Sequence, residues 1–296
     1  MKTLNLVDLE KSEIKCKISR FPDGQQQVFV DPSFYSEDIK GVVIKSRLNN
    51  FSDLELIICA KKSLQCQGIL GNVHLYVPYF LGSRSDRCFI LGENNYLRDV
   101  ICPIINSLNF DSVTVVDPHS DVLEACLNNF MKKDNEQVVR HALFNFKLPP
   151  NSDKYILISP DAGANKKIYK LAEQIGYKGD IITCSKSRDV EGKLSKTIVP
   201  LKLADCYKDK DYIIIDDICD GGRTFINIAN ELQSLIGKKS KLYLIVTHGV
   251  FSKGFAELSK YFDGIYCTNS YKDISSTEWD GDKTDVPTGV KQLNVF

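Results

Sequence analysis

The sequence predicts an α/β fold of mostly parallel sheets flanked by helices, and two observations support this class. Short runs of aliphatic and β-branched residues end in polar or glycine-containing loops and lead into residues with helical spacing, which is typical of parallel α/β sheets. The clearest runs are Val113–Val116, Tyr155–Ile158 and Tyr212–Ile215. In addition, the 296 residues of the chain suffice for two domains, given a usual domain size of about 100–200 residues.

The composition argues against nucleic acid and membranes as binding partners. The 38 basic and 38 acidic side chains balance, so no overall field favours nucleic acid or an anionic membrane, and any anion site has to be local. Charged residues interrupt the N-terminal segment, and no apolar run approaches the roughly 20 residues of a membrane helix. The ten cysteines form no C-x-x-C pair, which favours reduced cysteines. We therefore expect a cytoplasmic protein that binds neither nucleic acid nor membranes.

Two loops in the first half of the chain suit a polyphosphate. After an apolar run, Arg84 and Arg87 flank Asp86 in a short cationic loop, a pattern that fits a polyphosphate and a solvated turn equally well. His119 follows Asp117 at the end of the next predicted strand. An imidazole there can reach a metal ion or a phosphate, although a lone histidine is more often a structural hydrogen-bonding residue.

A break in the periodicity marks the junction between two domains. The segment 146–152 combines two prolines with polar residues between periodic stretches, which is typical of a linker. We place the first domain at residues 1–147 and the second at 148–277. The remaining residues, 278–296, form an irregular tail that can pack back on the first domain.

The third predicted strand leads into a loop that suits a sugar phosphate. Asp216 and Asp217 follow Tyr212–Ile215 directly and offer carboxylates to ribose hydroxyls, while Thr224 offers a hydroxyl to a phosphate oxygen. The glycine pair 221–222 lets the backbone approach an anion at the start of a helix, where the amides and the helix dipole attract it. A turn of purely geometric purpose is the alternative, but two adjacent carboxylates after an apolar strand are costly unless they are used.

The helix after this loop is specified by apolar residues on one face. Arg223 or Thr224 is expected in its first turn. The spacing of 3.6 residues per turn places on one face Phe225, Ile228, Ala229, Leu232, Leu235 and Ile236. Neither of the common nucleotide loops, G-x-x-x-x-G-K-[ST] and G-x-G-x-x-G, occurs in the chain. The loop therefore represents a different kind of phosphate site.

Residues 216–224 resemble the motif that binds phosphoribosyl pyrophosphate (PRPP) in phosphoribosyltransferases and in PRPP synthetases. Over nearly its whole length, the chain resembles the ribose-phosphate pyrophosphokinase (PRPP synthetase) family in particular. Five further segments carry this resemblance: Phe21–Gln25 is similar to F-x-D-G-E, Tyr76–Arg87 to P-Y-F-x-Y-A-R-Q-D-R, Val116–Ser120 to D-L-H-S, Ser159–Gly163 to P-D-x-G, and Ser185–Arg188 to the K-x-R of a flexible catalytic loop.

The resemblance implies a fold, a reaction and an assembly. The fold would be two phosphoribosyltransferase-like domains, each a mostly parallel sheet flanked by helices. The reaction would transfer the β,γ-diphosphate of Mg-ATP to the anomeric hydroxyl of ribose 5-phosphate, giving PRPP and AMP. The assembly would be a homo-oligomer, a dimer or larger, because in the family the segment that matches Phe21–Gln25 approaches the adenine of ATP from a neighbouring subunit.

The resemblance also implies roles for individual residues. The catalytic cations would be Lys186 and Arg188. ATP would be bound by Phe21, Asp23, Gln25, Arg84, Ser85 and His119. Ribose 5-phosphate would be bound by Asp216, Asp217, Asp220, Gly221, Gly222, Arg223 and Thr224. Magnesium, Mg²⁺, would be held by His119 and Asp161.

Three positions depart from the family pattern, and two other functions stay open. Ser85 replaces a glutamine, Gln25 replaces a glutamate, and Arg223 stands in the phosphate loop where a small residue is common. The first alternative is a phosphoribosyltransferase that consumes PRPP, and the second is a non-catalytic synthetase-like regulatory subunit. The predicted ATP loops argue against the first alternative, and the retained catalytic and metal residues argue against the second.

Overall fold

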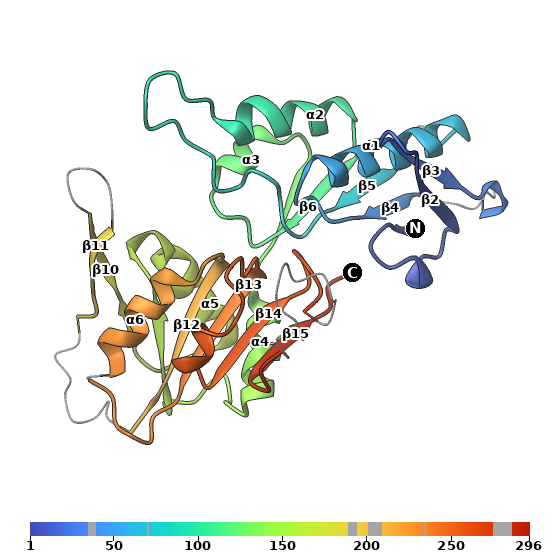
Figure 1. Cartoon of the computed structure of the whole chain (residues 1–296). Helices are drawn as coiled ribbons and strands as arrows, with labels where there is room; N and C mark the ends of the chain where they lie inside the picture. Colours follow the sequence, from blue (N-terminus) through green and yellow to red (C-terminus); the bar gives the residue numbers. More distant parts are fainter. Residues whose placement is uncertain (35–39, 70, 189–193, 201–208, 234, 275–285) are drawn as a thin grey trace. The chain divides into compact units, whose positions relative to one another are not determined.

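The computed structural model describes residues 1–34, 40–69, 71–188, 194–200, 209–233, 235–274 and 286–296. By its internal contacts the chain divides into two compact units, and each contains a parallel sheet with helices beside it (Figure 1). The first unit comprises Met1–Asp134 with Val295–Phe296, and the second comprises Asn135–Asn294. The predicted α/β class of parallel sheets flanked by helices is confirmed.

The division falls earlier than the boundary that we placed at residue 147. Helix α4 (Glu136–Phe146) contacts helix α5 (Asn165–Ile175) and two strands of the second unit. Its buried side chains Val139 and Leu143 share a core with the second sheet. Because the apolar face of α4 packs against the second sheet, α4 is part of the second unit.

The first unit is built on a five-stranded sheet in which all neighbours are parallel. In sheet order its strands are β1 (Lys2–Asn5), β4 (Val42–Lys45), β5 (Val73–Tyr76), β6 (Ser112–Val116) and β7 (Phe130–Lys133). The order follows the chain without a reversal. The other elements are η1 (Leu9–Lys11), the antiparallel hairpin β2 (Cys16–Arg20) and β3 (Gln26–Val30), η2 (Pro32–Phe34), α1 (Phe51–Cys66), η3 (Leu97–Ile101), α2 (Cys102–Ser107) and α3 (Val122–Cys126).

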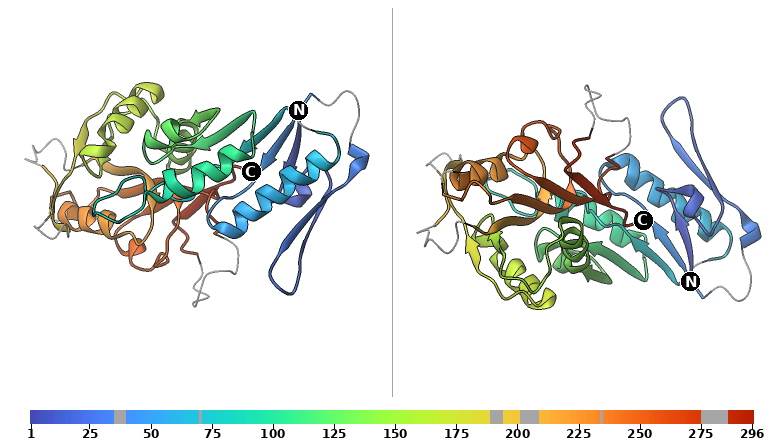
Figure 2. Two further views of the ribbon diagram at one scale, coloured as in Figure 1. Left: turned by 90° about the horizontal axis from the view of Figure 1, so that it is seen from above. Right: turned by 90° about the horizontal axis from the view of Figure 1, so that it is seen from below.

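Helix α1 shows how local sequence sets these elements. The Asn50 side chain accepts a hydrogen bond from the Asp53 amide at 3.0 Å and so caps the first turn. Its buried residues recur at helical spacing, among them Leu54, Ile57 and Leu64. Helices α1 and α2 lie over the same face of the sheet (Figures 1 and 2).

The second unit contains a six-stranded sheet that is also parallel throughout. In sheet order its strands are β15 (Val290–Leu293), β14 (Gly264–Thr268), β13 (Leu242–Gly249), β12 (Asp211–Cys219), β8 (Tyr155–Ser159) and β9 (Ile181–Thr183). The remaining elements are η4 (Ala162–Ala164), the hairpin β10 (Ser185–Arg188) and β11 (Leu194–Ile198), α6 (Arg223–Gln233) and η6 (Leu258–Lys260). The strand order therefore reverses between β8 and β12, where open α/β sheets bind ligands outside the carboxyl ends of their strands.

Alternate residues of the central strands face two separate cores. Ile214 of β12 packs with α6, whereas Ile213 packs with α4 and α5. Helix α6 thus covers one face of the sheet, and α4 and α5 cover the other (Figure 1). Burial on both faces explains why β8, β12 and β13 read as nearly continuous apolar runs.

The end of the chain contributes to both units. Of the predicted tail, residues 278–285 lie outside the described residues, and β15 adds an edge strand beside β14. Phe296 counts with the first unit, where its ring centroid lies 6.3 Å from that of Tyr76 and 5.7 Å from the guanidinium of Arg47. Among the described residues, no helix is long and apolar enough to cross a bilayer.

Candidate functional site

The first unit brings the arginine loop and the histidine loop together. Arg84 follows β5 and His119 follows β6, and the two loops leave the same edge of the sheet because these strands are parallel neighbours. The Ser120 hydroxyl donates to the Asp86 carboxylate at 2.5 Å, which links the loops directly. The sequence predicted these loops separately, and the parallel pairing of β5 and β6 places them side by side.

Buried acidic groups fix these loops, while the cationic side chains point outward. Asp86 and Asp117 are buried, whereas Arg84, Ser85 and His119 are exposed. The Asn95 side chain donates to the backbone carbonyl of Asp86 at 2.6 Å, and Asp117 has a left-handed φ of 43°. Aspartate tolerates that conformation better than most residues. The arrangement can present a cation and an imidazole to an anionic ligand at this edge.

The segment Phe21–Gln25 is the tip of the β2–β3 hairpin. The Phe21 amide donates to the Gln25 carbonyl at 2.8 Å, and the Gln25 amide donates to the Asp23 carboxylate at 3.2 Å. Gly24 has a φ of +96°, which explains its place in this turn. The Phe21 ring is 47% exposed, so the tip presents an aromatic surface to solvent.

In the second unit, Asp161 lies in the turn between β8 and α5. Its carboxylate Oδ1 accepts a hydrogen bond from the Ala164 amide at 3.1 Å and caps η4. The Ser159 hydroxyl donates to the Asp161 carbonyl at 2.8 Å. The turn lies at the carboxyl end of β8, directly beside the reversal in strand order.

Strand β12 is longer than the sequence predicted. We expected the strand to end at Ile215, but pairing with β13 continues through Cys219, which lies opposite Gly249. Asp216 and Asp217 are therefore strand residues and not loop residues. The sequence interpretation was wrong here because carboxylates disfavour strands locally, whereas pairing with a buried neighbouring strand overrides that preference.

The two carboxylates on β12 have different partners. The Asp217 amide donates to the Asp216 carboxylate at 2.9 Å, and Asp217 itself is only 6% exposed. The Lys167 ammonium on α5 lies 3.6 Å from the Asp217 carboxylate. Burial, and next the charge of Asp217, raises the pKa of Asp216 well above its ordinary value, with Asp161 adding to the shift. The charges of Asp217 and Asp161 thus both act on Asp216 at the reversal point.

The glycine loop and the start of α6 follow these carboxylates. Gly222 has a φ of +76°, and a Cβ atom there would lie only 3.0 Å from Leu258 Cδ2, so both conformation and space require glycine. Helix α6 begins at Arg223, as predicted, and the predicted apolar face is confirmed from Phe225 to Leu232. Leu235 and Ile236 lie beyond the last helical residue. Arg223 is exposed, while Asp220, Gly221 and Thr224 are half-buried.

Lys186 and Arg188 lie on β10, where we expected a flexible loop. In the hairpin they pair with Thr197 and Leu194 of β11, and the register shifts between Ser187 and Arg188. Residues 189–193 of the same segment lie outside the described residues.

Sequence reasoning missed Lys167, the ion-pair partner of Asp217. The partner lies on α5, far from Asp217 along the chain, and α5 carries two other lysines, Lys166 and Lys170. Neither spacing nor charge pattern distinguishes Lys167 from its neighbours. Only the packing of α5 beside the sheet reveals the pair.

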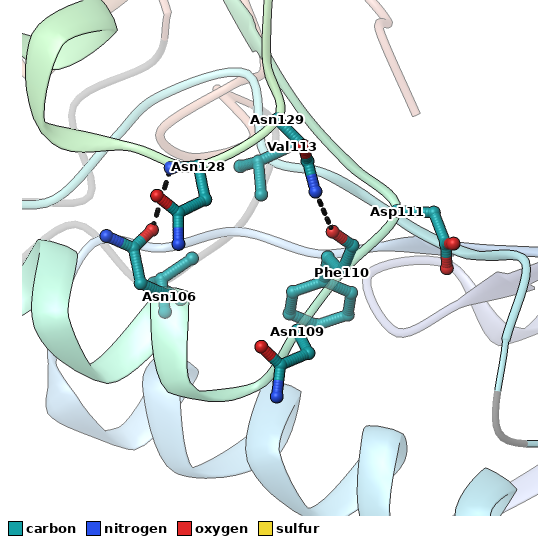
Figure 3. Close-up of a pocket in the computed structure, with 8 residues that line it drawn as sticks. Asn106, Asn109, Phe110, Asp111, Val113, Asn128 and Asn129 are labelled. Atoms are coloured by element: carbon teal, nitrogen blue, oxygen red, sulfur yellow. Dashed lines mark hydrogen bonds between the residues drawn. The ribbon is translucent and has the colours of Figure 1, made fainter.

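The first unit also contains a pocket that the sequence did not predict. Figure 3 shows this pocket of about 140 Å³, which is lined by Ile105, Asn106, Asn109, Phe110, Asp111, Val113, Asn128 and Asn129. The Asn129 side chain donates to the Phe110 carbonyl at 2.9 Å, and the Asn106 side chain accepts from the Asn128 amide at 2.9 Å. Val113 lies near the start of β6 and the other lining residues precede β6 or β7, so the pocket lies at the opposite sheet edge from His119. It forms no part of the candidate site.

The donor set suits magnesium that arrives with a phosphate ligand. The described residues contain no group of three or more His, Cys, Asp or Glu side chains arranged to hold a metal ion. Mg²⁺ is usually bound through one or two carboxylates together with substrate phosphates and water. In the second unit, Asp161 at the end of β8 provides a carboxylate of this kind.

Comparisons with known proteins agree with this architecture. No family model matches the chain. A ribose-phosphate pyrophosphokinase of Thermococcus kodakarensis is 27% identical over 270 residues, covering 87% of this chain and 86% of the relative. One of Pyrococcus abyssi is 26% identical over 259 residues, covering 87% and 84%. The crystal structure of a phosphoribosylpyrophosphate synthetase from Mycobacterium smegmatis covers 97% of this chain and 88% of that chain, with a TM-score of 0.71 and 16% identity.

Proposed function

We propose that this chain, which is similar to ribose-phosphate pyrophosphokinases over most of its length, catalyses the formation of PRPP. In that reaction the anomeric hydroxyl oxygen of ribose 5-phosphate bonds to the β-phosphorus of ATP. The bond from the β-phosphorus to the oxygen shared with the α-phosphate breaks, AMP leaves, and the hydroxyl proton is released.

One observation carries the proposal. In the second unit, Asp161 at the end of β8 and Asp216 and Asp217 near the end of β12 lie at the reversal of strand order, and β12 leads into a glycine loop and the start of α6. Carboxylates accept hydrogen bonds from sugar hydroxyls, and a glycine loop before a helix binds phosphate. The arrangement therefore suits a ligand that is both a sugar and a phosphate.

For ribose 5-phosphate, we assign the ring hydroxyls to the carboxylates and the 5-phosphate to the loop. Asp216 and Asp217 accept from the ring hydroxyls. The phosphate binds the residues of the loop and of the first turn of α6, namely Asp220, Gly221, Gly222, Arg223 and Thr224. The pair formed by Lys167 and Asp217 keeps one carboxylate oriented while a sugar binds.

For ATP, we assign the loops at one edge of the first unit. Arg84 and His119 bind the polyphosphate, with Ser85 beside Arg84. Phe21, Asp23 and Gln25 contact the adenine of an ATP molecule bound to a neighbouring subunit, which requires a homo-oligomer of at least two chains.

Lys186 and Arg188 stabilise the charge that develops during transfer. Catalysis of phosphoryl-type transfer depends mainly on positioning and on cations directed at the transferred group. Asp161 in the second unit and His119 in the first are the residues that would bind Mg²⁺, which would neutralise charge on the phosphates.

The proposal is tested by a product assay with ATP, ribose 5-phosphate and Mg²⁺. We expect AMP and PRPP in equal amounts, and no AMP when ribose 5-phosphate is omitted. Consumption of PRPP with a nucleobase, without AMP formation from ATP, would instead identify a phosphoribosyltransferase. Absence of both reactions would favour a non-catalytic regulatory subunit and overturn the proposal.

A further inference from the structure

The turn after β13 is fixed against the end of β12. The amides of Val250 and Phe251 both donate to the Cys219 carbonyl, at 2.9 and 3.0 Å. Phe251 is buried and its ring packs on Phe255, with centroids 4.6 Å apart. The Gly254 amide donates to the Phe251 carbonyl at 2.9 Å and closes the turn. The backbone of residues 250–254 therefore has a defined position beside the phosphate loop.

Lys253, in this turn, extends along Gly221 of the phosphate loop. A Cβ atom at Gly221 would lie 3.8, 3.6 and 3.7 Å from Cγ, Cδ and Cε of Lys253. Three successive carbons of the lysine side chain thus lie at van der Waals distance from that Cβ position, so the stem of Lys253 runs beside Gly221. Gly221 is not one of the glycines with positive φ in the described structure, so its backbone conformation does not require glycine.

The charge of Lys253 has no partner in the described part of the chain. No described carboxylate forms an ion pair with Lys253, and the residue is exposed. By contrast, Lys260, a little further along the same segment, pairs with Glu257 at 2.6 Å. The phosphate loop therefore contains one exposed cation, Arg223 at the start of α6, and has a second one, Lys253, beside its residue Gly221.

We propose that Lys253 is a further binding residue of the phosphate loop and contacts the phosphate of a sugar monophosphate. This inference rests on the proposed function, because it deepens the recognition of ribose 5-phosphate by the same loop. A lysine ammonium is a compact charge on a flexible stem, which suits a phosphate that the loop amides already orient. The alternative is that the stem only covers the glycine backbone while the ammonium stays in water.

Lys253→Met separates these possibilities because it keeps the apolar stem and removes the charge. By isothermal titration calorimetry we expect Kd for ribose 5-phosphate to increase about tenfold, as for the loss of one charge-assisted contact. Lys253→Arg should retain most of the affinity. Lys260→Met, the matched control, should bind like the wild type. Melting temperatures show whether each variant is folded.

Different outcomes separate the inference from the proposed function. In steady-state kinetics, Lys253→Met should increase KM for ribose 5-phosphate and leave KM for ATP unchanged. Unchanged Kd in a folded Lys253→Met protein overturns the inference even if PRPP forms. Loss of affinity in this variant supports the inference even if the wild type makes no AMP. Failure of the wild type to bind ribose 5-phosphate overturns both.

Discussion

Asp216 carries a carboxyl group whose surroundings oppose its charge. It lies near the end of β12, and desolvation, then the neighbouring charge of Asp217 and a contribution from Asp161 raise the pKa of its carboxyl group. A carboxylate in such a place lowers the stability of the folded chain when it is ionised. An aspartate with this cost is typical of a functional site, where a ligand offsets it by hydrogen bonding.

We predict that Asp216→Asn stabilises the free protein in a pH-dependent way. Because the folded state raises the pKa of Asp216, its contribution to stability is full below the ordinary value of 3.8 and is lost as pH rises through the raised pKa. The melting temperature of the variant should therefore exceed that of the wild type at pH 7–8 by a few degrees, about 2–4 °C per kcal/mol. The difference should shrink as the pH falls toward about 4.

Asp217→Asn is the matched control for this change. It removes the carboxylate that pairs with Lys167 and leaves a partly buried ammonium without that partner. We expect a lower melting temperature than that of the wild type. If the difference in melting temperature between Asp216→Asn and the wild type did not vary with pH, ionisation of Asp216 would not be its cause.

At the scale of residues, the sequence indicated which residues form the phosphate loop but not which distant residues contact the site. The order of two aspartates, two glycines, an arginine and a threonine is local information, and it was enough to indicate the phosphate loop. Lys167, which pairs with Asp217 on β12, and Lys253, which lies beside Gly221 of the loop, were not predicted, because each comes from another element and nothing near it in the sequence indicates the contact. Such partners depend on packing between segments that are distant along the chain.

Strand β12 illustrates what sequence determines about an element and what it does not. The apolar run gave its start and its direction, and Arg223 gave the start of the next helix. The end of β12 depends on its pairing with β13, which continues to Cys219 opposite Gly249. Local preference therefore placed the end of the strand too early.

For the hairpin of β10 and β11, we predict a kinetic role for Lys186. Lys186→Ala should lower kcat by about 100-fold or more, as for other losses of a charge-stabilising group, and change KM values little. Steady-state kinetics with both substrates measures this split. Lys196→Ala is the matched control on β11, where residue 196 lies opposite Ser187, and it should retain wild-type kcat. An equal loss of kcat in both variants would indicate a structural effect on the hairpin.

At the scale of the whole molecule, the chain forms two units with separate parallel sheets. Sequence predicted two domains of this class because each half repeats the pattern of an apolar run, a polar loop and a helix. It did not predict that α4 would lie in the second unit, whereas the place of Phe296 in the first unit agrees with the expectation that the tail can pack back on the first domain. The placement of α4 and the placement of Phe296 both depend on which apolar surface each packs against, and the local sequence pattern does not specify that surface.

We predict that Phe296→Ala destabilises the first unit selectively. The change removes an aromatic contact with Tyr76 on β5, worth about 1 kcal/mol. In hydrogen–deuterium exchange, amides of β4 and β5 should exchange faster, while those of β12 and β13 should be unaffected. Phe89→Ala removes a ring that is 81% exposed and should change neither set. Equal acceleration in both sheets would contradict this assignment.

The position of β15 has a consequence for how the chain folds as it is made. The first sheet uses strands that end at Lys133, so it can close while the rest of the chain is still being translated. The second sheet is complete only after residues 290–293 have left the ribosome, because among the described residues they form the strand that pairs with the outer edge of β14. Until then, the edge of β14 has unpaired backbone groups. The nascent second unit is therefore most prone to aggregation and to chaperone binding before β15 has paired.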